Sequence, residues 1–247
     1  MSQSARQRII MPSTFLRGRP DPSAEAATEL LFGEEVTVAF RRADWAEIES
    51  LTDGYRGFID AAALGPAGNS ATHRLAALRS FVYPEPNLKA PPVTSLSFLS
   101  RVRPIVERGG FVEIDGGGWM FAGHLAPIDQ AEPDFAETAI RFLGVPYLWG
   151  GRTSLGLDCS ALLQLSLAAS GIPAPRDSGP QRALGQRVLG DAPPRARDLV
   201  FWPGHVGIMA DAELLVHANA TFMAVTLEPL ADVARRIDAM PEIRRLY

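Results

Sequence analysis

Three side chains in the C-terminal half of the sequence have residue types suited to nucleophilic catalysis. Cys159 is the only cysteine among the 247 residues, and two histidines, His205 and His217, follow it downstream. A thiolate nucleophile needs a base within hydrogen-bond reach and a third group that holds this base in its working tautomer. A lone cysteine is more often a small buried apolar residue, so its surroundings decide between the two interpretations.

The residue before the cysteine indicates a helix start. Asp158 is a good N-cap residue, and the apolar side chains after it predict a buried helix that ends at Gly171. The N-terminus of a helix favours an anion, because its first N–H groups have no intrahelical partner and its dipole is positive there. We therefore expect a lowered pKa for the Cys159 thiol and a larger thiolate fraction.

The two downstream histidines fall on neighbouring segments with strand character. His205 follows Pro203 and Gly204 at a strand start, and His217 lies on the next strand. Adjacent antiparallel strands bring such positions side by side, so we expect the two imidazoles to be close enough to touch. The strands are expected at residues 198–202, 205–209 and 214–218.

The chain divides by its patterns into three parts. A helix capped by Asp134, the buried helix and the following strands predict an α+β domain over residues 131–247. Short strands between glycine and proline turns predict small all-β barrels over residues 1–68 and 69–130, with residues 1–28 as an extended entry to the first. The barrel strands are expected at 35–40, 45–49, 55–59, 81–83, 102–106, 111–114 and 119–121.

Composition and charge argue against several other classes of function. The net charge of −4 gives no reason to expect nucleic acid as a partner, and a single cysteine excludes an intrachain disulfide and a cysteine-based structural zinc site. We expect neither a metal nor an organic cofactor. The apolar stretch at residues 9–11 is too short for a signal peptide, and no later segment reaches transmembrane length. A cytoplasmic protein without membrane insertion is therefore expected, and its oligomeric state is left open.

Three motifs in series resemble the NlpC/p60 family of papain-like cell-wall cysteine peptidases. They are Asp158-Cys159-Ser160 at the helix start, Asp198-Leu199-Val200-Phe201 leading into Gly204-His205-Val206-Gly207-Ile208, and His217-Ala218. The resemblance implies a papain-like fold with Cys159 as nucleophile, His205 as general base and His217 as the residue that orients the base. The family usually has glycine where Arg197 stands in this chain, a departure that affects a turn and not the chemistry.

The resemblance also implies a substrate. The family hydrolyses the amide bond between γ-D-glutamate and a diamino acid, usually meso-diaminopimelate or lysine, in peptidoglycan stem peptides. Tyr147 matches an aromatic residue near the family's oxyanion site, and Trp149 is grouped with it as substrate-binding. Arg176, Asp177 and Ser178, in the loop after the buried helix, are expected to meet the D-glutamate carboxylate.

The two N-terminal regions resemble a tandem of bacterial SH3-like domains, through the segments LLFGEEVTV and DGYRGFI. In similar recycling enzymes the first of these domains walls off one end of the cleft, so that the substrate must be a short muropeptide with a free N-terminal L-Ala. The resemblance then implies that Asp158, Ser160, Glu34 and Tyr55 meet the substrate ammonium. His73 and His124 lie in these regions and are interpreted as structural histidines.

Two alternatives to a cell-wall peptidase remain open from the sequence. One is another cysteine amidase or acyltransferase of the same fold. The other is a wall-binding protein whose SH3-like domains tether it and whose third domain is inactive. The complete set of Cys159, His205 and His217 argues against inactivity, because a binding module has no need of all three.

Overall fold

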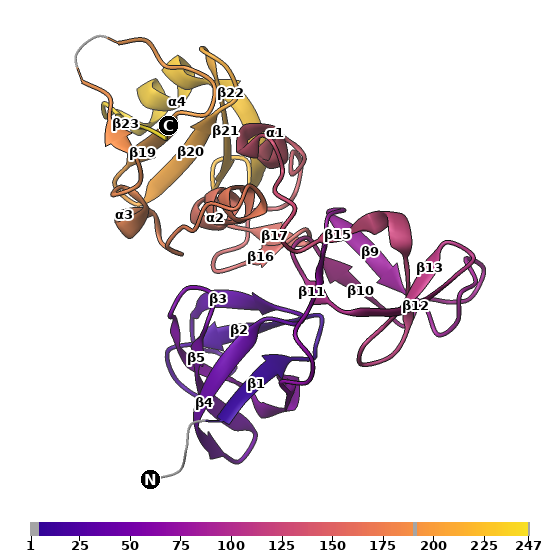
Figure 1. Cartoon of the computed structure of the whole chain (residues 1–247). Coiled ribbons are helices and arrows are strands. Elements are labelled where there is room, and N and C mark those ends of the chain that lie inside the picture. Colours follow the sequence, from indigo (N-terminus) through magenta and orange to yellow (C-terminus); the bar gives the residue numbers. More distant parts are fainter. Residues whose placement is uncertain (1–4, 190–191, 247) are drawn as a thin grey trace. The chain divides into compact units, whose positions relative to one another are not determined.

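The computed structural model describes residues 5–189 and 192–246 (Figure 1). The chain forms two compact units, one up to Gln130 and one from Ala131 onward. It is mostly sheet with few helices. Among the helices of the described residues, none combines the length and the hydropathy that crossing a membrane requires.

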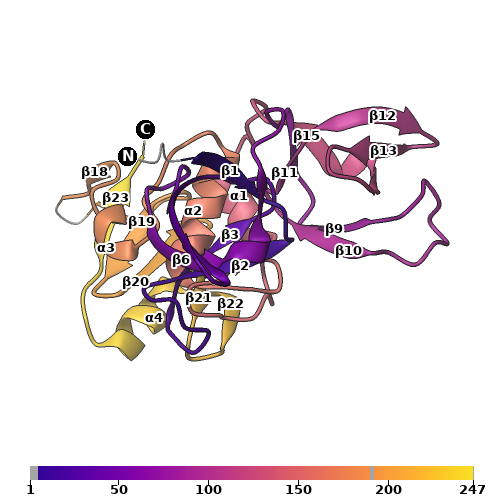
Figure 2. The ribbon, with the colours of Figure 1, turned by 90° about the horizontal axis from the view of Figure 1, so that it is seen from below.

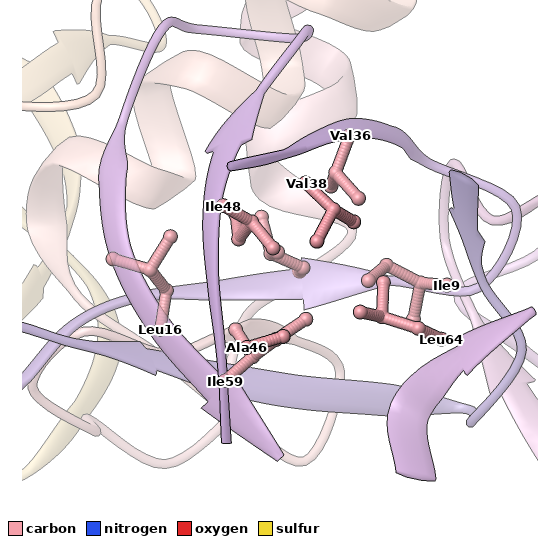
Figure 3. Packing of buried hydrophobic residues seen from close by; sticks show 9 residues of the cluster. Ile9, Leu16, Val36, Val38, Ala46, Ile48, Ile59 and Leu64 are labelled. Atoms are coloured by element: carbon pink, nitrogen blue, oxygen red, sulfur yellow. The ribbon is translucent and has the colours of Figure 1, made fainter. Parts of the chain in front are cut away.

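The first unit begins with a seven-stranded antiparallel sheet in the order β3-β2-β6-β5-β4-β1-β7. Side chains that alternate along these strands build a buried apolar core, which includes Ile9, Leu16, Val36, Ile48 and Ile59 (Figure 3). The strands are β1 (Ala5–Ile9), β2 (Ser13–Arg17), β3 (Ala26–Leu31), β4 (Glu35–Arg42), β5 (Trp45–Ser50), β6 (Arg56–Asp60) and β7 (Leu64–Pro66).

The expectation of an extended entry over residues 1–28 is wrong for the described part of that segment. β1 pairs with β4 and β7, and β2 pairs with β3 and β6. Among the side chains described on these two strands, Ile9 and Leu16 are fully buried, and most of their neighbours are polar. Such strands carry little periodic signal, because partner strands supply most of the core that they complete.

The rest of the first unit is a set of short sheets around a second apolar core. Leu75, Val82, Leu96, Ile114 and Met120 are buried together there. The β9–β10 and β12–β13 hairpins extend in the same direction from this core (Figure 2). The strands are β8 (His73–Leu75), β9 (Arg79–Val82), β10 (Thr94–Ser97), β11 (Arg101–Val102), β12 (Pro104–Arg108), β13 (Phe111–Ile114), β14 (Trp119–Phe121) and β15 (Leu125–Pro127).

The two cores of the first unit end in the same way. After β6 a single 3₁₀ turn, η1 (Ala61–Ala63), leads into the short strand β7, and after β14 the turn η2 (Ala122–His124) leads into β15. In the sequence, each ending is a short, mostly apolar segment after an aromatic-bearing strand, at residues 61–64 and 124–127. The two halves of the unit therefore share this local ending.

The second unit is built on a six-stranded antiparallel sheet in the order β18-β23-β19-β20-β21-β22. The expected hairpin strands β19, β20 and β21 are present, whereas β22, β23 and the last helix were not expected. The strands are β16 (Arg152–Thr153), β17 (Gly156–Leu157), β18 (Gln186–Arg187), β19 (Leu199–Trp202), β20 (His205–Met209), β21 (Leu214–Asn219), β22 (Ala224–Pro229) and β23 (Glu242–Arg245).

The helices of the second unit pack on this sheet. α1 (Phe135–Ile140) packs against α2 (Cys159–Ala169), and α2 packs against β20 and β21. α3 (Ser178–Gln181) is a single turn. α4 (Leu230–Ile237) buries Val233 among strand residues that include Trp202 and Leu215. The expected α+β arrangement is therefore observed, with α1 followed by turns over residues 141–144.

Candidate active site

Cys159 is the first residue of α2, and Asp158 caps this helix as the sequence predicted. The Asp158 Oδ1 atom accepts the backbone N–H of Ala161 at 2.8 Å. Cys159 is buried, and its sulfur accepts hydrogen bonds from the backbone N–H groups of Ser160 and Val206. Val206 directly follows His205 on β20, so the thiol lies at the start of the strand that carries this histidine.

The expected lowering of the thiol pKa does not occur in this structure. Burial, together with the neighbouring Asp158 carboxylate, raises the pKa of Cys159 to about 11. The N–H groups of Val206 and Ser160 oppose this rise, but they do not outweigh the loss of solvent. The helix start therefore assists the thiolate less than the sequence suggested, because the apolar surroundings of a buried helix act in the other direction.

The two histidines touch, which confirms the expectation from the hairpin. His205 Nε2 lies 2.8 Å from His217 Nδ1, and the two ring centroids are 5.0 Å apart. The His205 ring also lies beside Trp202, with 5.9 Å between centroids. Since Nε2 of His205 is engaged by His217, its Nδ1 is the ring nitrogen that remains for the thiol.

Both imidazoles are neutral at pH 7. Burial, together with the neighbouring His217 and Arg236, lowers the pKa of His205 to about 4, against the opposing charge of Glu228. Burial also lowers the pKa of His217, against the opposing hydrogen bond and charge of Glu228. A neutral thiol beside a neutral imidazole is therefore the resting state, and the imidazole is in the form that accepts a proton.

His205 and His217 form a row of hydrogen-bonded side chains. A carboxylate and an arginine that the sequence did not single out continue this row. Glu228 Oε1 lies 2.8 Å from His217 Nε2, and Arg236 Nη1 donates to Glu228 Oε2 at 2.8 Å. Although burial acts against it, the hydrogen bonds from Arg236, His217 and Thr226 lower the pKa of Glu228 to about 2. The alternation of β22 is the only signal for Glu228, and it is too weak to have identified the residue.

Arg176 has a different place from the one expected. It is 2% exposed, and its guanidinium donates to both carboxylate oxygens of Asp158, at 2.8 and 2.7 Å, and to Ser160 Oγ at 2.8 Å. Asp158 Oδ2 also accepts the backbone N–H of Gly150 at 2.9 Å. A guanidinium buried in this way is unsuited to meet a substrate carboxylate, so that part of the expectation is wrong, and the Asp158 charge is already paired.

The other expected substrate contacts in this unit lie around the helix start. Tyr147 is half-buried; burial raises the pKa of its hydroxyl to about 12, and the charge of Cys159 contributes, which places the phenol near the sulfur. Trp149 is exposed, as is Asp177, and Ser178 is half-buried at the start of α3.

Glu34 and Tyr55 belong to the first unit. Glu34 is buried, and its Oε2 accepts the backbone N–H of Leu31 at 2.9 Å. Tyr55 packs against the first apolar core. Their contact with a substrate ammonium stays a prediction.

Comparison with known proteins identifies two domains in the chain. The NlpC/P60 family matches residues 144–235, and the bacterial dipeptidyl-peptidase Sh3 domain matches residues 16–64. A γ-D-glutamyl-L-lysine dipeptidyl-peptidase of Bacillus subtilis (strain 168) is 27% identical over 83% of this chain and 76% of its own length. Dipeptidyl-peptidase 6 of Lysinibacillus sphaericus is 24% identical over 85% of this chain and 86% of its own length.

The fold has a close match among solved structures. An NlpC/P60 family protein from Bacillus cereus ATCC 10987 superimposes with a TM-score of 0.84, at 21% identity, over 98% of this chain and 99% of the other. The resemblance seen in the motifs around Cys159 and His205 is thus confirmed. The chain therefore carries an NlpC/P60 family domain, with a bacterial dipeptidyl-peptidase Sh3 domain in front of it.

Proposed function

We propose that this protein hydrolyses the γ-D-glutamyl-diamino acid amide bond of peptidoglycan stem peptides, with Cys159 as nucleophile and His205 as base. The observation that carries the proposal is the position of the Cys159 sulfur beside Val206, one residue from a histidine that is itself held by His217 at 2.8 Å. The name of the relative from Bacillus subtilis supports the same bond class.

The proposed chemistry follows from the resting protonation states. The thiol at Cys159 attacks the γ-carbonyl carbon while its proton passes to Nδ1 of His205, so no preformed ion pair is required. The oxyanion forms near the first turn of α2, where backbone N–H groups such as that of Cys159 point outward. The imidazolium then protonates the leaving amine, and a water molecule deprotonated by His205 hydrolyses the thioester.

The activity is tested with defined peptides. L-Ala-γ-D-Glu-meso-diaminopimelate, its L-lysine counterpart and polymeric peptidoglycan are incubated separately with the protein, and the products are followed by mass spectrometry. We expect release of L-Ala-D-Glu from the free peptides and no release by the Cys159→Ala and Cys159→Ser variants. Absence of cleavage in every substrate, or undiminished cleavage by the alanine variant, contradicts the proposal.

The proposal includes the substrate's free N-terminus and a role in cell-wall recycling. The first SH3-like domain would close one end of the cleft, with Glu34, Tyr55, Asp158 and Ser160 near the ammonium and Asp177 and Ser178 near the D-glutamate carboxylate. Free stem peptides as substrates would place the reaction in the cytoplasm. Acetylation of the N-terminal L-Ala is then expected to reduce kcat/KM about ten- to a hundredfold. Equal cleavage of acetylated and free peptides removes this part and leaves the peptidase intact.

The three-part division of the chain, 1–68, 69–130 and 131–247, is also proposed, with the second region as another SH3-like domain. The shared ending of the two cores, a 3₁₀ turn followed by a short strand, supports it. Expression of residues 1–68 alone, followed by its thermal unfolding, tests the division. A cooperative transition is expected, and a chain that stays unfolded contradicts it.

A further inference from the structure

One carboxylate lies at the far end of the row that starts at the thiol. His205, His217 and Glu228 come from the neighbouring strands β20, β21 and β22. His217 faces Thr226 across the β21–β22 ladder and Leu215 faces Glu228, so Glu228 lies on the same face of the sheet as His217, displaced by two residues. The row is therefore built into the strand register.

The surroundings of Glu228 keep it ionised. Arg236 on α4 donates to both carboxylate oxygens, from Nη1 to Oε2 at 2.8 Å and from Nη2 to Oε1 at 3.1 Å. The Thr226 hydroxyl donates to Oε1 at 2.9 Å. Together with His217, these donors hold the pKa of Glu228 at about 2. An ionised carboxylate accepts hydrogen bonds and donates none.

An acceptor at this position determines where the imidazole protons lie. His217 Nε2 must carry a proton to donate to Glu228 at 2.8 Å, which leaves a lone pair on His217 Nδ1. His205 Nε2 must in turn carry a proton to donate to that atom, which leaves the lone pair of His205 on Nδ1. We propose that Glu228 is a positioning residue, which selects the tautomers of both histidines and thereby makes His205 Nδ1 the base that faces Cys159.

A competing donor shows why the selection matters. The Asn219 side-chain amide nitrogen lies 3.3 Å from His217 Nε2 and donates at 2.8 Å to Thr226 Oγ1. Asn219 Oδ1 accepts the backbone N–H of Phe222 at 3.0 Å, so the amide group is oriented with its nitrogen toward the histidine. Without the Glu228 carboxylate, this amide favours a lone pair on His217 Nε2. Both tautomers then reverse, and His205 presents an N–H to the thiol.

The inference rests on the proposed function for its kinetic test but has a readout that does not need activity. Long-range proton–nitrogen NMR correlations on the unmodified protein report which nitrogen of each imidazole is protonated. We expect Nε2–H on His217 and Nε2–H on His205 at pH 7. Nδ1–H on either residue overturns the proposal, whatever substrates the protein cleaves.

The kinetic test compares three variants with the unmodified protein. Glu228→Ala is expected to lower kcat by roughly 10- to 100-fold with little change in KM, which is the size of effect typical of groups that orient a functional histidine. Glu228→Gln keeps an acceptor oxygen and is expected to lose less. The control is Glu242→Ala, on another strand of the same sheet. It removes a carboxylate that pairs with Arg182 at 2.6 Å, and it should keep the full rate.

The pH profile and a rescue variant separate positioning from a loss of fold. The Glu228 charge raises the pKa of both His205 and His217, so the acidic limb of kcat/KM should move to lower pH in Glu228→Ala and Glu228→Gln, and stay in place in Glu242→Ala. Adding Asn219→Asp to Glu228→Ala restores an acceptor near His217 Nε2 and should recover much of the rate. An unmoved acidic limb together with an unchanged rate in Glu228→Ala overturns the proposal.

Discussion

Two carboxylate–arginine pairs lie beside the candidate catalytic groups of the second unit, one at the start of α2 and one between β22 and α4. Asp158 and Arg176 are 2.7 Å apart, with side chains 10% and 1% exposed. Glu228 and Arg236 are 2.8 Å apart, with side chains 13% and 32% exposed. The chemistry of the two pairs is the same, but the more buried pair has its arginine enclosed by protein and the other has its arginine at the surface.

The pairs also differ in what else donates to the carboxylate. Asp158 accepts from the backbone of Gly150 and Ala161 and from the Ser160 hydroxyl, groups that do not titrate near pH 7. Glu228 accepts from His217, an imidazole that can change its protonation. The Asp158–Arg176 pair therefore holds the helix start together, whereas the Glu228–Arg236 pair sets the protonation state of His217.

The largest expected effects concern His205 and His217, which lie between Cys159 and Glu228. If the row transmits orientation toward the thiol, activity loss should fall with distance from Cys159. His205→Ala is expected to lower kcat by about a thousandfold or more, because base and nucleophile act as a unit. His217→Asn is expected to be milder, because an amide oxygen still orients His205. Steady-state hydrolysis of the tripeptide measures both, with His73→Ala and His124→Ala as controls that should keep the rate. An equal loss in the controls contradicts the ranking.

Substitution of the two arginines by methionine tests the comparison directly. Arg176→Met leaves the Asp158 charge buried without its partner and is expected to destabilise the protein by about 3–5 kcal/mol. Arg236→Met removes a half-exposed partner and should change the free energy of unfolding by less than about 1 kcal/mol, while lowering kcat a few-fold by loosening Glu228. Urea unfolding and hydrolysis rates measure the two effects.

The matched control for Arg236 is Arg235→Met, on the same helix. Arg235 pairs with Asp232 at 2.9 Å on an exposed surface, so its loss should change neither stability nor rate. If Arg236→Met destabilises the protein as strongly as Arg176→Met, both pairs are structural and the distinction between them fails.

The buried imidazoles predict a loss of stability in mild acid. The pKa of His205 is about 4 in the folded protein and about 6.5 in an unfolded chain, so the unfolded state binds a proton first as the pH falls. The free energy of unfolding should therefore fall between pH 6.5 and 4, by at most about 3 kcal/mol from this residue. His205→Gln should flatten the fall in urea titrations at pH 7, 5.5 and 4.5. An unchanged slope in this variant contradicts the low pKa of His205.

The parts of the site that were predictable depend on short-range patterns. The cap by Asp158, the helix that starts with Cys159 and the hairpin that joins His205 to His217 each involve neighbours along the chain or one turn, where propensity and periodicity act. These features occur in the structure as the sequence indicated, and the family motifs identified the same residues.

The parts that were missed depend on partners that the pattern does not reveal. Arginine is normally exposed, and only the carboxylate of Asp158, 18 positions away, makes the burial of Arg176 tolerable. Glu228 is an ordinary polar residue of an alternating strand until Arg236 on the next helix fixes it. The thiol pKa depends on the total burial of α2, which outweighs the local dipole that the sequence does show.

A third carboxylate–arginine pair lies beside a backbone turn, where a substitution has the smallest expected effect. Asp198 is fully buried and accepts two hydrogen bonds from Arg245, at 2.7 Å each. The residue before it, Arg197, has φ +73°, in the left-handed region that favours glycine, and this is the position where the family usually has glycine. The departure noticed in the sequence therefore corresponds to a strained turn beside an ion pair.

Arg197→Gly is expected to stabilise the protein by about 0.5–1 kcal/mol. Relief of the left-handed conformation contributes roughly 1–2 kcal/mol, and the greater freedom of glycine in the unfolded chain offsets about 0.4–1 kcal/mol of it. The exposed contact between Arg197 and Asp134, at 3.8 Å, contributes little. Arg197→Ala is the matched control, because it loses the same contact and keeps a Cβ atom in the strained turn. A higher urea midpoint for glycine than for alanine supports strain as the cause, and equal midpoints show that the turn holds Arg197 without cost.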